Sequence, residues 1–146
     1  MYNIGIIGIR GFDVLYSGFE TFVKHLVQKS DSNKYFYTLF CRNIYQNKRN
    51  ANNNCRLIVV PVVKNKYLET FFYSLVSNVY SLFVKQLDIV LYLGVVNTPL
   101  IFLQHLAGRK TIVNVDGIDW QRKRWAFAGK IYLKICERLS VKFADV

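Results

Sequence analysis

Apolar residues form short continuous runs and longer helically spaced runs, and the two kinds alternate along the chain. The short runs predict strands at 3–9, 35–41, 57–63, 88–93 and 110–115. The longer runs predict helices from Ser17 to the polar run at 30–33, over 68–85, from Thr98 to Gly108, and over 126–143. Strand–helix alternation of this kind predicts an α/β fold: a Rossmann-like, doubly wound parallel sheet with helices on both faces.

Local signals place the helix ends. Ser17 followed by Glu20 has the spacing of a capping box, in which both side chains cap the first turn. Thr98 and Pro99 look like the cap and first position of the third helix, which Gly108 closes. The apolar positions of the first helix are Phe19, Phe22, Val23, Leu26 and Val27, and those of the last helix include Ile131, Ile135, Leu139 and Val141.

Composition describes one folded domain. The 146 residues are 52% hydrophobic and 20% charged, and the polar stretch 47–54 reads as a surface loop between strands. Cys41, Cys55 and Cys136 fit no metal spacing or disulfide framework, so we expect buried thiols. A strand is expected to begin at 144–146, so the chain is expected to be a piece of a longer protein. The net charge of +11 would attract nucleic acid, anionic lipid or a diphosphate-bearing substrate.

The loop after the first strand is rich in glycine and polar residues. In a parallel sheet, ligands bind at the carboxyl ends of the strands, where this loop lies. Glycine lets the backbone approach a ligand, and the following helix start suits a phosphate. The glycine spacing and the missing acid after the second strand do not match a dinucleotide fingerprint. A tight turn is the alternative, as is a capping role for Glu20. Candidate ligand contacts are Gly8, Arg10, Gly11, Tyr16, Gly18 and Glu20.

Two later loops lie at the same edge of the predicted sheet. In the first, Asn97 can touch a sugar hydroxyl or simply shape a turn. The second combines Asp116, Gly117, Trp120 and Arg122 after a buried strand. Carboxylates act as bases, tryptophan stacks on sugar faces, and arginine pairs with phosphate. This convergence favours function over a solvated loop with a packed tryptophan.

The segments GIIGIRG…YSGFETFVKHL and NVDGIDWQRKRW together resemble the N-terminal domain of rhamnosyltransferase-like members of the retaining GT-B glycosyltransferases (family 4) of bacterial capsule and O-antigen synthesis. The resemblance covers essentially the whole chain. It implies that residues 1–146 form the acceptor-side domain of a GT-B fold. The nucleotide-sugar would be held mainly by a C-terminal domain, which is absent here, so this chain alone is expected not to turn over.

The resemblance also implies residue roles. Gly11 and Gly18 would form the loop beside the donor diphosphate and the acceptor, and Asp116 stands where many relatives place a catalytic histidine. Phe12 stands where an isoleucine is expected, and Ser17 replaces a glycine. No metal or other cofactor is implied, and the nucleotide-sugar is a substrate.

The resulting hypothesis is sugar transfer to a lipid-diphosphate-linked saccharide, in the cytoplasm or on the inner face of the cell membrane. The basic run at 122–124, continued by Lys130, Lys134, Arg138 and Lys142, would meet anionic headgroups or the acceptor diphosphate. The helix over 68–85 either rests on the membrane or covers the sheet, and the second is favoured. Two alternatives remain: a nucleotide-binding oxidoreductase domain, and a non-catalytic truncated binding module. No nucleic-acid-binding motif is present in the sequence.

Overall fold

The computed structural model describes residues 1–12, 14, 17–45, 54–63, 65, 68–115, 117, 119–121 and 125–146. The elements in chain order are β1 (Tyr2–Ile7), α1 (Gly18–Lys29), β2 (Tyr35–Arg42), β3 (Cys55–Val60), α2 (Glu69–Phe83), β4 (Ile89–Leu93), the 3₁₀ helix η1 (Val95–Asn97), α3 (Ile101–Leu106), β5 (Lys110–Asn114), the 3₁₀ helix η2 (Asp119–Gln121) and α4 (Phe127–Phe143). The five strands and four helices predicted within residues 3–143 are present, with ends displaced by a few residues, whereas residues 144–146, where a further strand was expected to begin, form no strand.

The strands form one sheet in the order β3-β2-β1-β4-β5, and every pair is parallel. β1 is central: Ile4 lies opposite Tyr37 of β2 on one side and Ile89 of β4 on the other. From β1 the chain builds the sheet outward on one side through β2 and β3, and then on the other side through β4 and β5. The prediction of a Rossmann-like α/β fold is therefore confirmed.

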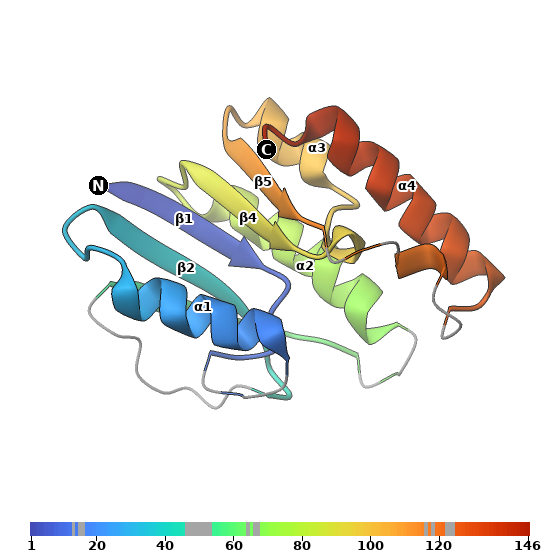
Figure 1. Cartoon of the computed structure of the whole chain (residues 1–146), viewed down its shortest axis with the longest axis horizontal. Helices are drawn as coiled ribbons and strands as arrows, with labels where there is room; N and C mark the ends of the chain where they lie inside the picture. Colours follow the sequence, from blue (N-terminus) through green and yellow to red (C-terminus); the bar gives the residue numbers. More distant parts are fainter. Residues whose placement is uncertain are drawn as a thin grey trace.

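Helices cover both faces of the sheet. α1 lies in front of β2, and α2 lies behind the sheet (Figure 1). Val23 and Val27 of α1 pack with Ile6 and Leu39 in one core. The second core joins α2, α3 and α4 to the other face, and it includes Ile7, Phe40, Tyr73, Val90, Ile101 and Leu139.

α1 begins where the sequence predicted, after Ser17, whereas α3 begins later than predicted. Ser17 is the N-cap of α1, and its side chain accepts from the Phe19 N–H. α3 begins three residues after Thr98, with Leu100 at its N-cap. The buried Thr98 hydroxyl instead lies 2.7 Å from the Val95 carbonyl and 2.9 Å from the Ser140 hydroxyl of α4. The prediction that Thr98 caps a helix is therefore wrong, because the hydroxyl joins η1 to α4.

The burial of several residues differs from what the sequence predicted. Asn54 belongs to the stretch predicted as a surface loop, yet it is buried and donates from its amide to the Val27 carbonyl at 2.9 Å. Ile131, Ile135 and Val141 are exposed, and the buried residues of α4 are Leu133, Cys136 and Ser140. All three cysteines are buried thiols, as expected.

The end of the described chain lies against β5. The Asp145 N–H donates to the Thr111 carbonyl at 2.8 Å, and the Val113 N–H donates to the Val146 carbonyl at 2.9 Å. A carboxylate oxygen of Asp145 accepts from the Thr111 N–H at 2.7 Å, which holds the pKa of Asp145 below its usual value. These bonds fix the end of α4 beside the edge of the sheet.

Candidate functional site at the carboxyl edge of the sheet

β1 and β4 are neighbours at the centre of the sheet, and both end at a glycine. Ile7 is paired with Tyr92, so Gly8 and Gly94 follow at nearly the same level. The chain then leaves β1 toward α1 on one face and β4 toward α3 on the other face. This divergence is the topological switch point at which open α/β sheets bind ligands. The described candidates of all three loops lie along this edge of the sheet.

Gly8 is the position where the two central loops come closest. Its φ is +124°, and a Cβ there would lie 2.4 Å from the Leu93 carbonyl oxygen and 2.9 Å from the Asn97 amide nitrogen. No side chain fits that space without moving backbone. Gly8 also donates its N–H to the Tyr73 hydroxyl at 3.0 Å. The glycine therefore serves close packing between β1 and β4, and its contact with a ligand stays a prediction.

Asn97 is only 2% exposed, and its amide serves internal bonds. The Nδ2 atom donates to the Leu93 carbonyl at 2.6 Å, and Oδ1 lies 3.0 Å from the Ser74 hydroxyl. These bonds hold the turn after β4 in shape beneath Gly8. The geometry thus gives Asn97 the turn-shaping role, and a contact with a sugar hydroxyl stays a prediction.

Glu20 ties the glycine-rich loop to the start of α1. Its side chain is 3% exposed, one oxygen accepts from the Arg10 N–H at 3.0 Å, and the other bonds the Ser17 hydroxyl. The carboxylate therefore reaches the loop backbone and the cap side chain. The Arg10 guanidinium lies 5.1 Å from the centre of the Tyr45 ring, and its Nη1 donates to the Tyr45 hydroxyl at 3.3 Å.

The other candidates of this loop differ in environment. Gly11 is buried, whereas Gly18 is exposed at the first position of α1 with no atom within 4 Å of a built Cβ. At the end of β2, Arg42 is buried, stacks 4.6 Å from the centre of the Tyr73 ring and pairs with Glu69 at 2.6 Å. Tyr16, Asp116 and Arg122 lie outside the described residues.

The loop after β5 brings Trp120 against α4. Gly117 is exposed with φ +81°, a conformation that favours glycine. The Trp120 indole N–H donates to Glu137 at 2.9 Å, and the Lys134 ammonium lies 4.5 Å from the centre of the Trp120 ring. The ring is therefore held between an acid and a base of α4. It is only partly buried, so the tryptophan remains accessible at the surface.

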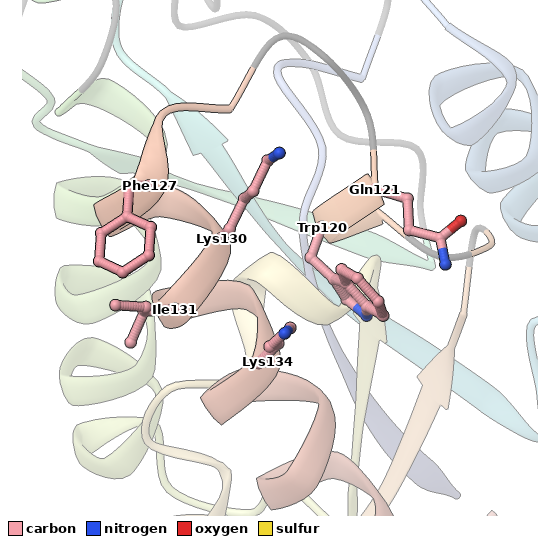
Figure 2. Close-up of a pocket in the computed structure, with 6 residues that line it drawn as sticks. All are labelled: Trp120, Gln121, Phe127, Lys130, Ile131 and Lys134. Carbon is pink, nitrogen blue, oxygen red and sulfur yellow. The ribbon is translucent and has the colours of Figure 1, made fainter.

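An open pocket of about 420 Å³ adjoins Trp120. Figure 2 shows its lining: Lys130 and Lys134 of α4 lie between Trp120 with Gln121 on one side and Phe127 with Ile131 on the other. Aromatic faces suit sugar rings, and ammonium groups suit phosphates. The sequence placed both lysines on a basic face but did not identify the pocket. The repeat of Phe127 and Ile131 four residues apart was its only signal, and that repeat reads equally well as core.

Two properties of the described residues complete the site. No group of three or more His, Cys, Asp or Glu side chains among them is arranged to hold a metal ion. Within the same residues, no helix has both the length and the apolar content needed to cross a bilayer.

The model of a family described as "Domain of unknown function (DUF1972)" matches residues 1–146. A search of curated proteins gave no match to the chain.

Proposed function

The chain belongs to the DUF1972 family, and we propose that it is the acceptor-side domain of a glycosyltransferase. DUF1972 domains are associated with the N-terminal regions of glycosyltransferases. The reaction would transfer a sugar from a nucleotide-sugar to a lipid-diphosphate-linked saccharide in surface polysaccharide synthesis, on the cytoplasmic side of the membrane. The resemblance of the two loop segments to rhamnosyltransferase-like enzymes supports hexosyl or rhamnosyl transfer.

One observation carries the proposal: the pocket beside Trp120 combines aromatic faces with two lysines. A saccharide linked through a diphosphate has the same two parts, a ring with an apolar face and a dianionic group. In this arrangement Trp120 stacks on the sugar, while Lys130 and Lys134 neutralise the diphosphate. The pocket is built on η2, in the loop that follows the carboxyl end of β5, and on the first turns of α4.

Binding of an acceptor analogue tests the proposal without catalysis. The probe is a short-chain prenyl-diphosphate-linked N-acetylglucosamine, titrated calorimetrically against residues 1–146. We expect Trp120→Ala and Lys130→Ala/Lys134→Ala each to weaken binding about five- to thirtyfold, because each removes roughly 1–2 kcal/mol of contact. The matched control is Lys24→Ala/Lys29→Ala on α1, across the sheet. Equal weakening in the control, or no binding by the parent chain, contradicts the proposal.

Asp116 is the proposed catalytic carboxylate, acting on the acceptor hydroxyl as a base. Its test needs turnover, measured in a protein that carries this chain together with a donor-binding domain. Asp116→Asn should lower kcat by roughly 10²–10⁴ with little change in KM. Asp119→Asn is the neighbouring control and should retain most of the activity. The reverse pattern would move the catalytic role to Asp119.

A further inference from the structure

α2 covers the sheet with a mostly polar face and exposes an apolar face, the reverse of the usual arrangement. Its buried residues are Tyr73, Ser74, Ser77, Asn78 and Ser81, of which four are small and polar or an amide. Its exposed residues are large and apolar or aromatic: Phe71, Phe72, Val79, Tyr80 and Phe83, preceded by Leu68 at the N-cap. Amphipathic helices of globular proteins normally bury the apolar stripe and expose the polar face.

A buried hydrogen-bond network fixes this orientation. Asn78 donates from its amide to the Ser74 carbonyl at 2.7 Å and to the Asn97 carbonyl at 3.1 Å, and its Oδ1 accepts from the Tyr92 hydroxyl at 2.5 Å. Gln104 of α3 donates to the Ser81 hydroxyl at 2.7 Å. Rotating α2 to bury its apolar stripe would break these bonds and strand polar groups of β4 and α3. The apolar side must therefore face outward.

The outward stripe is continuous and uncharged. Leu68, Phe72, Val79 and Phe83 are spaced by 4, 7 and 4 residues, which places them on one line of the helix. Phe72 is 45% exposed and Phe83 is 80% exposed. The single charged residue of α2 is Glu69, which pairs with Arg42 at 2.6 Å. Soluble monomers rarely expose a contiguous apolar stripe of this length unless it meets a partner.

α4 extends this surface and adds positive charge. Phe71 of α2 meets Tyr132 of α4 edge-on, with ring centres 5.3 Å apart, so the two helices touch. α4 exposes both apolar and basic side chains, and its one acid, Glu137, bonds the Trp120 indole. The exposed apolar residues are Phe127, Ile131, Ile135 and Val141. The exposed basic residues are Lys134, Arg138 and Lys142, and Lys130 is half-buried.

We infer that the outer faces of α2 and α4 together dock on the surface of an anionic bilayer. The apolar stripe of α2 enters the interface, and the bases of α4 meet phosphate headgroups. Charge complementarity favours this occupant over a second copy of the chain, because a copy would bring the same four α4 cations and a net charge of +11 against them. The inference goes beyond the proposed transfer reaction, since docking requires neither a sugar donor nor an acceptor.

Sedimentation with lipid vesicles tests the inference. Residues 1–146 are mixed with vesicles of phosphatidylcholine alone, or of phosphatidylcholine containing phosphatidylglycerol. We expect binding about tenfold tighter or more to the anionic vesicles. Phe72→Ser/Phe83→Ser removes two exposed apolar side chains, and Arg138→Glu/Lys142→Glu reverses two charges outside the Trp120 pocket. Each pair should weaken binding about tenfold.

Matched controls come from α1, on the opposite face of the sheet. Phe22→Ser replaces an exposed aromatic, and Lys24→Glu/Lys29→Glu makes the same change in net charge. Both controls should bind like the parent chain. Thermal melting and circular dichroism of every variant confirm that the fold is kept.

Three outcomes would overturn the inference. The first is equal binding to neutral and anionic vesicles, or to neither. The second is equal weakening by the α1 charge pair, which would mean attraction by net charge alone. The third is a dimer by light scattering that Phe72→Ser/Phe83→Ser dissociates while vesicle binding is absent, which would assign the face to a second copy. Because the vesicles carry no saccharide, each of these results leaves the transferase proposal to its own test.

Discussion

The hydroxyl of Tyr73, on α2, accepts the backbone N–H of Gly8 at 3.0 Å, at the point where β1 ends. The same hydroxyl donates to the Phe40 carbonyl of β2 at 2.6 Å. One buried side chain of the covering helix thereby holds the glycine-rich loop in place and ties it to the neighbouring strand. Arg42, stacked on the Tyr73 ring and paired with Glu69, closes the same corner of the sheet edge.

Replacing Tyr73 with Phe should destabilise the fold. The change keeps the ring but leaves the half-buried Gly8 N–H without this acceptor, at a cost of roughly 1–3 kcal/mol in the free energy of unfolding. Urea denaturation followed by circular dichroism measures the change. Tyr80→Phe, on the exposed side of the same helix, is the matched control and should stay within about 0.5 kcal/mol of the parent chain. A similar loss in both variants would show that the Tyr73 bonds contribute nothing of their own.

The same side chain should make stability fall in alkaline solution. Burial raises the pKa of Tyr73 to about 12, against about 10 in an unfolded chain. Below pH 10 the Tyr73 hydroxyl stays protonated in both the folded and the unfolded state, so its contribution to the free energy of unfolding is fully present. Between pH 10 and 12 only the unfolded state releases the proton, so stability falls by up to roughly 2–3 kcal/mol.

Urea denaturation at pH 8, 10 and 11.5 checks this expectation. The gap in unfolding free energy between the parent chain and Tyr73→Phe should narrow as the pH rises, because the variant lacks the titrating hydroxyl. A constant gap would mean that Tyr73 ionises alike in both states. Burial also raises the pKa of Tyr92 and Tyr132, so the variant itself still loses stability in base.

Most of the fold was predictable from sequence because its signals are local. The run from β1 into Ser17 and Glu20 carries strand periodicity, a glycine turn and a helix start within one short window. Burial inside the helices was less predictable. The orientation of α2 depends on Asn97, Tyr92 and Gln104, which are distant in sequence and satisfy its polar side. Read from the α2 segment alone, without these partners, the sequence favours burial of its large apolar residues.

The candidate site divides in the same way. Glycine, tryptophan and clustered charge at strand ends predicted a site at the carboxyl edge of the sheet, and those of its residues that the structure describes follow strands that end at this edge. The sequence does not reveal that Asn97 is enclosed under Gly8, or that Glu20 bonds the Arg10 N–H, because both facts require the packed loops. Ile131 was predicted as an apolar helix position and Phe127 was not singled out, because an apolar pair four residues apart is usually buried. Their exposure is a tertiary property, set by Leu133 and Cys136 on the opposite side of α4.

Gly8 should not tolerate alanine. The added methyl would lie 2.4 Å from the Leu93 carbonyl, in a backbone conformation with φ +124°, and the combined clash and strain should cost roughly 2–5 kcal/mol. Gly18→Ala is the matched control from the same loop, because its Cβ meets nothing within 4 Å and the residue is helical. It should be unchanged or up to about 1 kcal/mol more stable. Thermal melting of both variants measures the difference. Equal melting temperatures for Gly8→Ala and Gly18→Ala would contradict the argument that Gly8 is required for close packing.

Arg109 should be a stabilising cap for the C-terminal end of α2. Its guanidinium donates to the carbonyls of Ser81 at 2.7 Å, Val84 at 3.0 Å and Leu82 at 3.3 Å. Arg109→Met removes these three bonds and a fourth, to the Gln104 side-chain oxygen at 2.8 Å, and should cost roughly 1–3 kcal/mol. Lys85→Met is an exposed control beside the same helix end, expected to stay within about 0.5 kcal/mol. Chemical denaturation compares the two, and equal stabilities would show that water replaces the guanidinium without loss.

Glu137 should position Trp120 for its proposed contact with the acceptor sugar. The indole N–H donates to this carboxylate at 2.9 Å, so Glu137→Leu should release the ring and weaken binding of the prenyl-diphosphate-linked sugar about three- to tenfold. Glu137→Gln keeps an acceptor oxygen and should restore most of the affinity. A ligand-independent readout accompanies the titration. In a Trp125→Phe background, where Trp120 is the sole tryptophan, Glu137→Leu should shift its fluorescence emission and Glu137→Gln should not. Weakened binding in both variants with no shift in either would mean that the charge of Glu137, and not the position of the ring, matters to the acceptor.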